Sequence, residues 1–110
     1  MLPGRPPNVV QRFVDAAASR DFAAIATCFS EDATVSDEEH TYRGRAQIRR
    51  WQEDGRKRWE YTLTVKDGKV RGADGYIMQG HLTGNFPGGE ADVEYDFTVR
   101  DGLISRLAIS

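Results

Sequence analysis

Residues 29–44 read F-S-E-D-A-T-V-S-D-E-E-H-T-Y-R-G, and the rest of the chain is arranged around this stretch. Its first half predicts a strand along which Ala33, Val35 and Asp37 share one face, because side chains alternate along a strand. Ala33 and Val35 mark that face as the inward one, so Asp37 is an acidic residue where an apolar one is expected. A carboxylate in apolar surroundings resists ionisation and can act as an acid or a base near neutral pH.

A second interpretation is that the strand has already ended before these acidic residues. Asp37, Glu38 and Glu39 then form a solvated acidic loop, and His40 is solvated with them. Spacing alone favours this second interpretation, because carboxylates that face inward are rare.

Two helices are predicted before the strand. Asn8 is a candidate N-cap for the first and Asp21 for the second, and residues 1–7 form a Pro-rich lead-in that we expect to be mobile. Apolar residues recur at helical spacing in both: Val9, Val10, Phe13, Val14 and Ala17, and then Phe22, Ile25, Ala26 and Phe29. Cys28 lies at the edge of the second stripe, where a buried and inert thiol is expected.

A third helix is predicted over residues 45–56, with Ile48 and Trp51 on its apolar side. The basic side chains here are Arg45, Arg49, Arg50, Arg56, Lys57 and Arg58. They could bind an anionic ligand or RNA, or they could form a solvated face that balances the acidic loops. We favour the solvated face, because the whole chain carries a formal net charge of -2.

From Trp59 onward the apolar period changes to two, which predicts strands. The first of these is interrupted at residues 66–69 by either a turn or a bulge. We favour a bulge within one long strand, with the true hairpin at residues 73–75. Further strands are predicted over residues 76–86 and 93–99, separated by a Pro-Gly-Gly turn at 87–89.

The register of the last hairpin is predicted from its buried face. A two-residue Asp101-Gly102 turn would mix polar and apolar side chains on both faces, so we predict a three-residue loop at 100–102. The resulting pairs are Val99 with Leu103, Tyr95 with Leu107 and Val93 with Ile109, and on the other face Asp96 with Arg106. Asp96 is therefore expected to be a surface ion-pair partner and not a catalytic acid.

Helices early in the chain and an antiparallel meander late in the chain predict an α+β domain, in which helices cover one face of a curved sheet. Such a cone leaves a cavity at its open end. The aromatic residues expected to face inward, either as core or as cavity wall, are Phe13, Phe29, Trp51, Trp59, Tyr61, Tyr95 and Phe97.

Length and composition exclude several classes of protein. A chain of 110 residues is expected to be one domain, and its charge balance lacks the strongly basic character of a nucleic-acid-binding protein. No apolar run is long enough to cross a membrane, and residues 1–7 lack the apolar segment of a signal peptide. The single cysteine excludes an internal disulfide and is compatible with a cytoplasmic location.

Six segments, which follow one another over nearly the whole chain, carry a family resemblance. They are V-V-Q-R-F-V at 9–14, R-D-F-A-A-I at 20–25, F-S-E-D-A-T-V-S-D at 29–37, Y-R-G-R-A-Q-I at 42–48, G-N-F-P-G at 84–88 and Y-D-F-T-V-R-D-G-L-I at 95–104. On these segments the chain resembles the nuclear transport factor 2-like superfamily, and within it the SnoaL-like and steroid delta-isomerase-like proteins. The resemblance implies a cone-shaped α+β fold, with residues 1–110 as one SnoaL-like domain in which three N-terminal helices pack on a curved, mainly antiparallel sheet. It implies no single activity, because this scaffold hosts isomerases, cyclases, dehydratases, hydrolases and domains without catalysis.

The resemblance also implies roles for individual residues. In the steroid delta-isomerases an Asp at the end of the first strand moves a proton between carbons beside a ketone, and Asp37 matches that position. The two groups that stabilise the oxygen in that family, a Tyr on the first helix and a protonated acid on a late strand, fall on Phe13 and Tyr95. Phe13 has no hydroxyl, and the loss of one such donor typically costs ~10²–10³ in rate. Tyr95 could donate a hydrogen bond in place of the acid, with Tyr61 or Tyr42 nearby.

His81 can be placed in two ways. On the outer face of the sheet it would be a surface or interface residue, whereas in the cavity it could pair with Asp37 for dehydration or hydration chemistry. The two histidines of the chain have no spacing typical of metal ligands, so we expect neither a metal nor a cofactor.

Two functions are therefore considered from the sequence. One is a cofactor-free enzyme, in which Asp37 shuttles a proton, Tyr95 hydrogen-bonds an oxygen, and a small apolar or carbonyl-containing molecule fills the cone. The residues predicted to line its pocket are Phe13, Trp51, Trp59, Tyr61 and Phe97. The other is a non-catalytic domain that binds a small molecule or a partner protein.

We also expect a homodimer. Family members commonly dimerise through the outer sheet face, where Ile77, Ile104 and Ala108 are predicted to be apolar positions among polar ones.

Overall fold

The structure, a computed structural model, describes residues 6–110, so most of the predicted N-terminal lead-in lies outside the described residues. Its helices are α1 (Asn8–Ser19), α2 (Phe22–Thr27) and α3 (Arg45–Arg58). Its strands are β1 (Phe29–Asp37), β2 (His40–Arg43), β3 (Tyr61–Arg71), β4 (Gly75–Gly84), β5 (Glu90–Arg100) and β6 (Leu103–Ile109).

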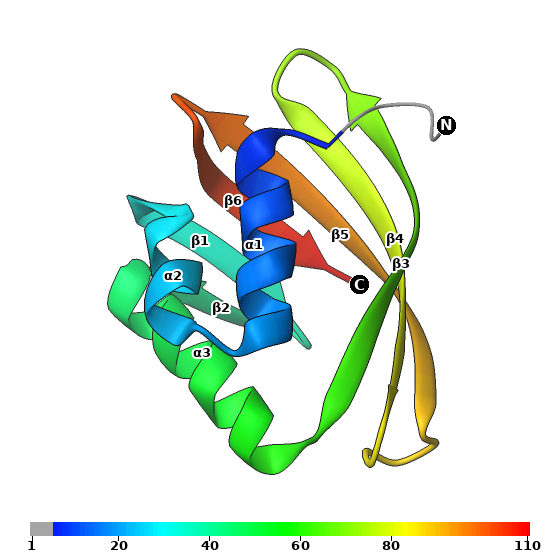
Figure 1. The fold of residues 1–110 in the computed structure, drawn as a ribbon. Coiled ribbons are helices and arrows are strands. Elements are labelled where there is room, and N and C mark those ends of the chain that lie inside the picture. Colours follow the sequence, from blue (N-terminus) through cyan, green and yellow to red (C-terminus); the bar gives the residue numbers. More distant parts are fainter. Residues whose placement is uncertain (1–5) are drawn as a thin grey trace.

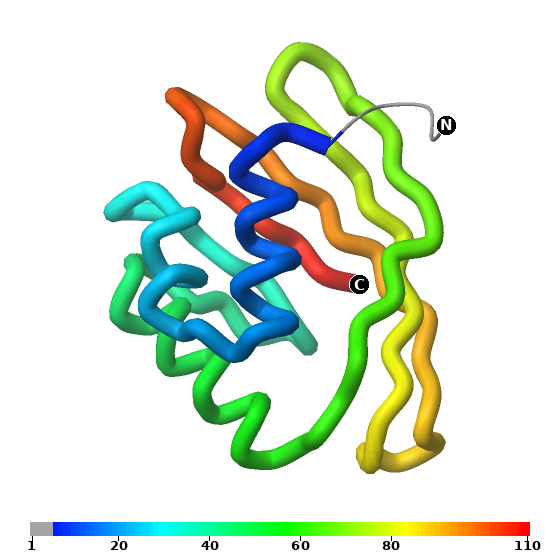
Figure 2. Tube along the Cα trace, in the orientation of Figure 1, coloured from blue at the N-terminus to red at the C-terminus, as the bar shows by residue number. Residues whose placement is uncertain are grey.

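The strands form one sheet in the order β2-β1-β6-β5-β4-β3. Only the β1–β6 pair is parallel among these neighbours, and the other pairs are antiparallel. The helices lie on one side of this sheet, and the long strands β3 to β5 curve past them (Figure 1). In the trace of Figure 2, β3 leaves the carboxyl end of α3 and runs along the far edge of the sheet. The predicted α+β class, with three helices on a curved and mainly antiparallel sheet, is confirmed.

Local sequence sets the boundary between α1 and α2. Helix α1 stops at Arg20, which adopts a left-handed conformation (φ 57°), and the Asp21 carboxylate then accepts a 3.1 Å hydrogen bond from the Ala24 N–H as the N-cap of α2. The predicted cap at Asp21 is thus confirmed. The predicted cap at Asn8 is wrong: Pro7 is the N-cap residue of α1, and no side chain caps that helix.

The core lies between the helices and the concave face of the sheet. Its largest fully buried side chains are Phe13, Phe29, Phe97, Ile25, Ile48, Ile104, Leu107, Val10 and Val35. Ile104 was expected on the outer face, and its complete burial corrects that expectation. The correction follows from the register of the last hairpin.

That hairpin differs from the predicted three-residue loop. Asp101 and Gly102, both with positive φ, form a two-residue turn that places Arg100 opposite Leu103. Such turns suit the right-handed twist of paired strands. A bulge between Thr98 and Val99 then shifts the pairing, and its apolar pairs are Val99 with Ile104, Phe97 with Leu107 and Tyr95 with Ile109. The bulge therefore restores the apolar face that the two-residue turn alone would disrupt.

The register also decides the partner of Asp96. Asp96 lies opposite Ala108 and not opposite Arg106, so the predicted ion pair with Arg106 is wrong. Its partner is Arg71 of β3, with 2.8 Å between the guanidinium and the carboxylate. Asp96 is a cross-strand surface partner, as expected, but of a different residue.

Strand β3 is one long strand with an irregularity between Val65 and Asp67, which confirms the predicted bulge. The chain reverses after Arg71, which pairs with Gly75, so the hairpin lies within one residue of its predicted position.

Strand β1 continues through Asp37, which pairs with His40 of β2. Glu38 and Glu39 form the turn between them with φ values of 50° and 67°, a conformation that L-residues rarely adopt. The acidic loop is therefore limited to these two residues, and Asp37 keeps the strand alternation set by Ala33 and Val35.

Candidate functional site

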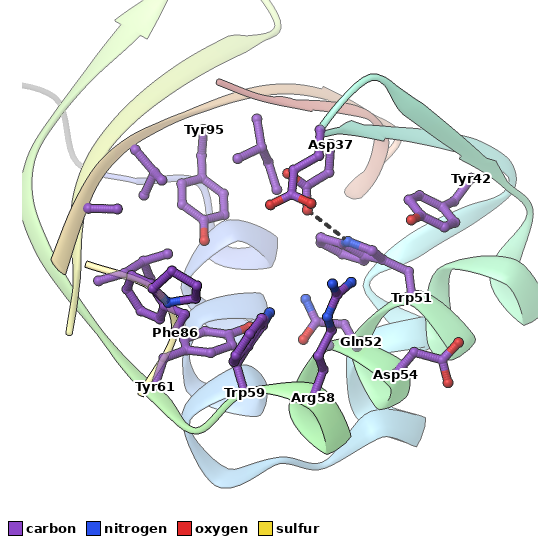
Figure 3. Close-up of a pocket in the computed structure, with 17 residues that line it drawn as sticks. Asp37, Tyr42, Trp51, Gln52, Asp54, Arg58, Trp59, Tyr61, Phe86 and Tyr95 are labelled. Atoms are coloured by element: carbon purple, nitrogen blue, oxygen red, sulfur yellow. Dashed lines mark hydrogen bonds between the residues drawn. The ribbon is translucent and has the colours of Figure 1, made fainter. Parts of the chain in front are cut away.

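A cavity of about 570 Å³ opens between helix α3, the β1–β2 hairpin and the concave side of β3 to β6. Figure 3 shows the side chains that point into it from these elements. The lining residues are Asp37, Glu38, Tyr42, Trp51, Gln52, Asp54, Gly55, Arg58, Trp59, Tyr61, Leu82, Phe86, Pro87, Ala91, Val93, Tyr95 and Ile109. Such a volume is within the range of small-molecule sites.

Asp37 lies in the wall of this cavity, half-buried at the end of β1. Its Oδ2 accepts a 3.0 Å hydrogen bond from the indole Nε1–H of Trp51 on α3 (Figure 3). Burial raises the pKa of Asp37 above its usual value, and the nearby Glu38 charge raises it further. The Trp51 hydrogen bond opposes this shift because it stabilises the carboxylate. The result is a carboxylate that binds a proton more readily than a solvated one.

The hydrogen bond to Trp51 gives a first prediction. In the variant Trp51→Phe the indole donor is lost, so the pKa of Asp37 is expected to rise further above that of the wild type. Titration of the Asp37 carboxyl carbon by NMR measures this change. Trp59→Phe is the matched control, because Trp59 also lines the cavity but makes no described hydrogen bond to Asp37. An unchanged or lower pKa in Trp51→Phe would contradict the assigned role of the indole.

Tyr95 enters the cavity from β5, and only 8% of its surface is exposed. Burial raises the pKa of its hydroxyl, and the nearby Tyr61 and Asp37 raise it further, so the hydroxyl stays protonated. Within residues 6–110 no hydrogen bond engages Tyr95 Oη, which leaves this O–H as a donor directed into the cavity (Figure 3). Tyr61 lies beside it, with the Arg56 guanidinium 3.9 Å from the Tyr61 ring centroid.

Phe13 and Phe97 do not line the cavity, contrary to the prediction. Both are buried in the core beneath it, where their ring centroids are 5.7 Å apart. Phe13 also packs edge-on against Phe29, at 5.8 Å, because α1 lies directly on the sheet at this point. Trp51, Trp59 and Tyr61 do line the cavity.

His81 lies on the outer face of the sheet and not in the cavity. Its Nδ1 is 2.7 Å from Asp92 and its Nε2 is 3.0 Å from Glu90, and these two hydrogen bonds raise its pKa. The considered pairing of His81 with Asp37 is therefore wrong, because strand alternation puts His81 on the same face as Gln79 and opposite to Met78, which is buried.

The basic residues of α3 are partly structural. Arg56 donates to the carbonyls of Tyr61 and Ala17, at 2.6 and 3.1 Å, and Arg45 donates to that of Phe29 at 2.8 Å. These bonds join α3 to neighbouring elements, and Arg58 lines the cavity, so the predicted solvated face holds only for Arg49, Arg50 and Lys57.

Comparison with known proteins identifies the family. A sequence model described as the SnoaL-like domain matches residues 10–107. The chain belongs to the SnoaL-like family. This confirms the resemblance drawn from the sequence, including the cone-shaped fold related to nuclear transport factor 2.

Solved structures share the fold. A candidate polyketide cyclase from Sinorhizobium meliloti is 31% identical, with a TM-score of 0.92 and coverage of 96% of this chain and 95% of that chain. A protein with a ketosteroid isomerase-like fold from Catenulispora acidiphila, in complex with trimethylamine, is 20% identical, with a TM-score of 0.86 and coverage of 96% and 86%. A Mycobacterium tuberculosis protein in complex with estradiol-17β-hemisuccinate is 14% identical, with a TM-score of 0.79 and coverage of 92% and 88%. None of the curated proteins matches the chain.

Two further observations bear on this SnoaL-like chain. No helix among residues 6–110 is both long enough and apolar enough to span a membrane. The same residues contain no group of three or more His, Cys, Asp or Glu side chains arranged to hold a metal ion.

Gln52 is a cavity residue that the sequence interpretation missed. It is only 6% exposed, and it is the one polar residue among the buried side chains of the described chain. A signal was present, since Ile48, Trp51 and Gln52 lie at i, i+3 and i+4, the spacing of one helix face. A polar residue on that apolar stripe could have been noted in the same way as Asp37 on its strand.

Proposed function

We propose that this SnoaL-like protein binds a small, mostly apolar carbonyl compound in the cavity and catalyses proton transfer without a cofactor. The observation that carries the proposal is the position of Asp37, a half-buried carboxylate in the cavity wall whose pKa is raised by burial. A base of this kind needs a substrate whose proton is made acidic by an adjacent carbonyl. The reaction would be of the isomerase, cyclase or dehydratase type.

Asp37 and Tyr95 would share the chemistry. The Asp37 carboxylate removes a proton from the carbon beside the carbonyl, and the C–H electron pair forms a C=C bond while the carbonyl π pair moves to oxygen. The Tyr95 O–H donates a hydrogen bond to that oxygen as its negative charge grows. Asp37 then returns the proton to the same carbon or to another one, which regenerates the carboxylate.

The local environment supports this division of roles. Tyr95 is buried and protonated, which suits a donor, and Asp37 is less buried and hydrogen-bonded by Trp51, which suits a base. The family's first-helix hydroxyl has no counterpart, because Phe13 occupies that position within the core. Tyr61, beside Tyr95, is the group best placed to add a second hydroxyl.

A non-catalytic binding domain is the second candidate. The observation that favours it is the Trp51 hydrogen bond, which stabilises the Asp37 carboxylate and so weakens it as a base. In that case the cavity would hold the ligand without changing it.

Exchange of carbon-bound hydrogen for deuterium separates the two candidates. In D₂O, the protein is expected to speed the exchange of the hydrogens beside the carbonyl of 1-tetralone, followed by proton NMR. The rate should rise with pH through the raised pKa of Asp37 and then level off, because the base is the deprotonated form. Binding of 1-tetralone without faster exchange would support the non-catalytic domain, and no binding would contradict both candidates for this class of ligand.

A homodimer through the outer sheet face remains our proposal. Ile77 and Ala108 support it, since both flank Asp96 in one row across β4, β5 and β6 and are half-exposed. Static light scattering at micromolar concentration would contradict the proposal if it gave the mass of one chain.

The proposed compartment is the cytoplasm. Cys28 is free and buried, and desolvation raises the pKa of its thiol, which disfavours the reactive thiolate. An unpaired thiol of this kind suits a reducing compartment.

A further inference from the structure

The side-chain amide of Gln52 has no hydrogen-bond partner among the described residues. Its Oε1 is buried without a partner, and no bond to its Nε2 occurs within residues 6–110. A buried acceptor such as this Oε1 is costly without a partner, because folding removes it from water without replacing its hydrogen bond. Glutamine on an exposed helix face would instead reach solvent.

The amide lies in the cavity that also holds Asp37 and Tyr95. Gln52 enters from helix α3, whereas Tyr95 enters from the sheet on the other side of the same cavity (Figure 3). A single molecule in this space of about 570 Å³ can therefore touch both walls. Its carbonyl end would meet Asp37 and Tyr95, and its other end would meet Gln52.

The chemistry of an amide limits what that other end can be. The Nε2–H₂ of Gln52 can donate to a ligand directly, and the buried Oε1 can accept once the amide turns toward the ligand, so a hydroxyl group can satisfy either atom. A carboxylate can satisfy only the donor. It would also meet the charges of Asp37, Glu38 and Asp54, which line the cavity against the single cation of Arg58.

We infer that Gln52 is a specificity-determining residue that binds a neutral hydroxyl group of the ligand, at the end opposite its reacting carbonyl. This inference rests on the proposed function, because it assumes that a carbonyl compound occupies the cavity. It adds that the compound carries a second polar group. Apolar ketones would then be poorer ligands than hydroxylated ones of the same shape.

Two probes of one shape test the inference. The compound 6-hydroxy-1-tetralone carries a hydroxyl at the ring end far from its carbonyl, and 1-tetralone lacks it. Quenching of Trp51 and Trp59 fluorescence reports binding of either probe, at a pH where the phenol is neutral. We expect the hydroxylated probe to bind the wild-type protein about three- to tenfold more tightly, as one net hydrogen bond allows.

The variant Gln52→Met keeps the length and helix preference of the side chain but removes the amide. It is expected to bind the two probes with equal affinity. Gln11→Met is the matched control, because Gln11 is exposed on α1 and bonds only to Asp15, and it should keep the wild-type preference. Equal binding of both probes by the wild type, or a preference that survives in Gln52→Met, would overturn the inference while leaving the proposed function standing.

Thermal unfolding gives a second, ligand-free readout. Because the amide makes no described hydrogen bond within the protein, Gln52→Met should unfold at the wild-type temperature or above it. A clear decrease would show that Gln52 stabilises the fold and would overturn the inference. If neither probe binds the wild type, the proposed function fails, and the inference fails with it.

Discussion

Replacement of Asp37 by asparagine is expected to lower the rate of hydrogen exchange from 1-tetralone by about 10²–10⁴-fold, the usual contribution of a positioned general base. Asparagine keeps the size of the side chain and an oxygen that can accept the Trp51 N–H, but it cannot take up a proton. The loss should therefore appear in the rate of exchange, measured at saturating probe, and far less in the affinity for the probe.

Two controls accompany the Asp37→Asn variant. Glu38→Gln removes the neighbouring carboxylate of the cavity wall and should change the rate only a few-fold, through its charge. The stability of Asp37→Asn at neutral pH should equal or exceed that of the wild type. The folded-state pKa of Asp37 is raised, so the folded protein binds the proton more tightly, and stability falls as pH rises from the unfolded value of 3.8 through the folded one. Exchange at the wild-type rate in Asp37→Asn would refute the role of this residue as the base.

Phe13→Ala is expected to lower the free energy of unfolding by about 3–5 kcal/mol, the range for the loss of a buried Phe side chain. Phe13 is 1% exposed, and its ring contacts those of Phe29, Phe97 and Tyr95 at centroid distances of 5.8, 5.7 and 6.5 Å. Truncation would leave a void where three aromatic side chains now meet. Urea denaturation followed by circular dichroism measures the change.

Val70→Ala is the control for this measurement, because Val70 is 59% exposed and its loss should change stability by less than about 0.5 kcal/mol. The result for Phe13→Ala shows whether Phe13 belongs to the core or to the cavity wall. If Phe13→Ala changed ligand affinity but left the unfolding free energy near that of the wild type, Phe13 would belong to the wall after all.

The period of apolar residues was sufficient to predict most elements and the α+β class. Helical spacing over residues 9–17 and 22–26 and alternation from Trp59 onward correspond to α1, α2 and the long strands, whereas Phe29, predicted on the stripe of the second helix, is the first residue of β1. The bulge in β3 was also predictable, because Asp67 and Gly68 interrupt the alternation within one strand. These features depend on residues close in sequence, where the geometry of a helix or a strand determines which side chains share a face.

The last hairpin depends on more than local patterning. Apolar alternation favoured a three-residue loop, but the protein combines a two-residue turn with a bulge between Thr98 and Val99. Both arrangements bury one apolar face. Sequence patterning does not distinguish them, because the difference lies in strand twist and in the pairing of Asp96 with Arg71 of a distant strand.

For the candidate site, too, some residues could be predicted from the sequence and others could not. Alternation along β1 allowed an inward Asp37 but favoured a solvated loop, and the family resemblance indicated Asp37 and Tyr95 as site residues. Neither indicated that Trp51 donates to Asp37 or that Gln52 lies unpartnered among the described residues of the same cavity. Nor did they separate Phe13 and Phe97, which are core, from Trp59 and Tyr61, which are wall.

By itself, the sequence therefore determined the helices, most strands and the inward face of most of them, and it marked Asp37 as an acidic residue that could lie on such a face. Only the tertiary structure decided which inward side chains border a cavity and which fill the core beneath it. The physical reason is that burial repeats with the local period of the backbone. A cavity, by contrast, arises from the curvature of the sheet and the distance at which α3 packs over it, and these depend on contacts among residues far apart in the chain.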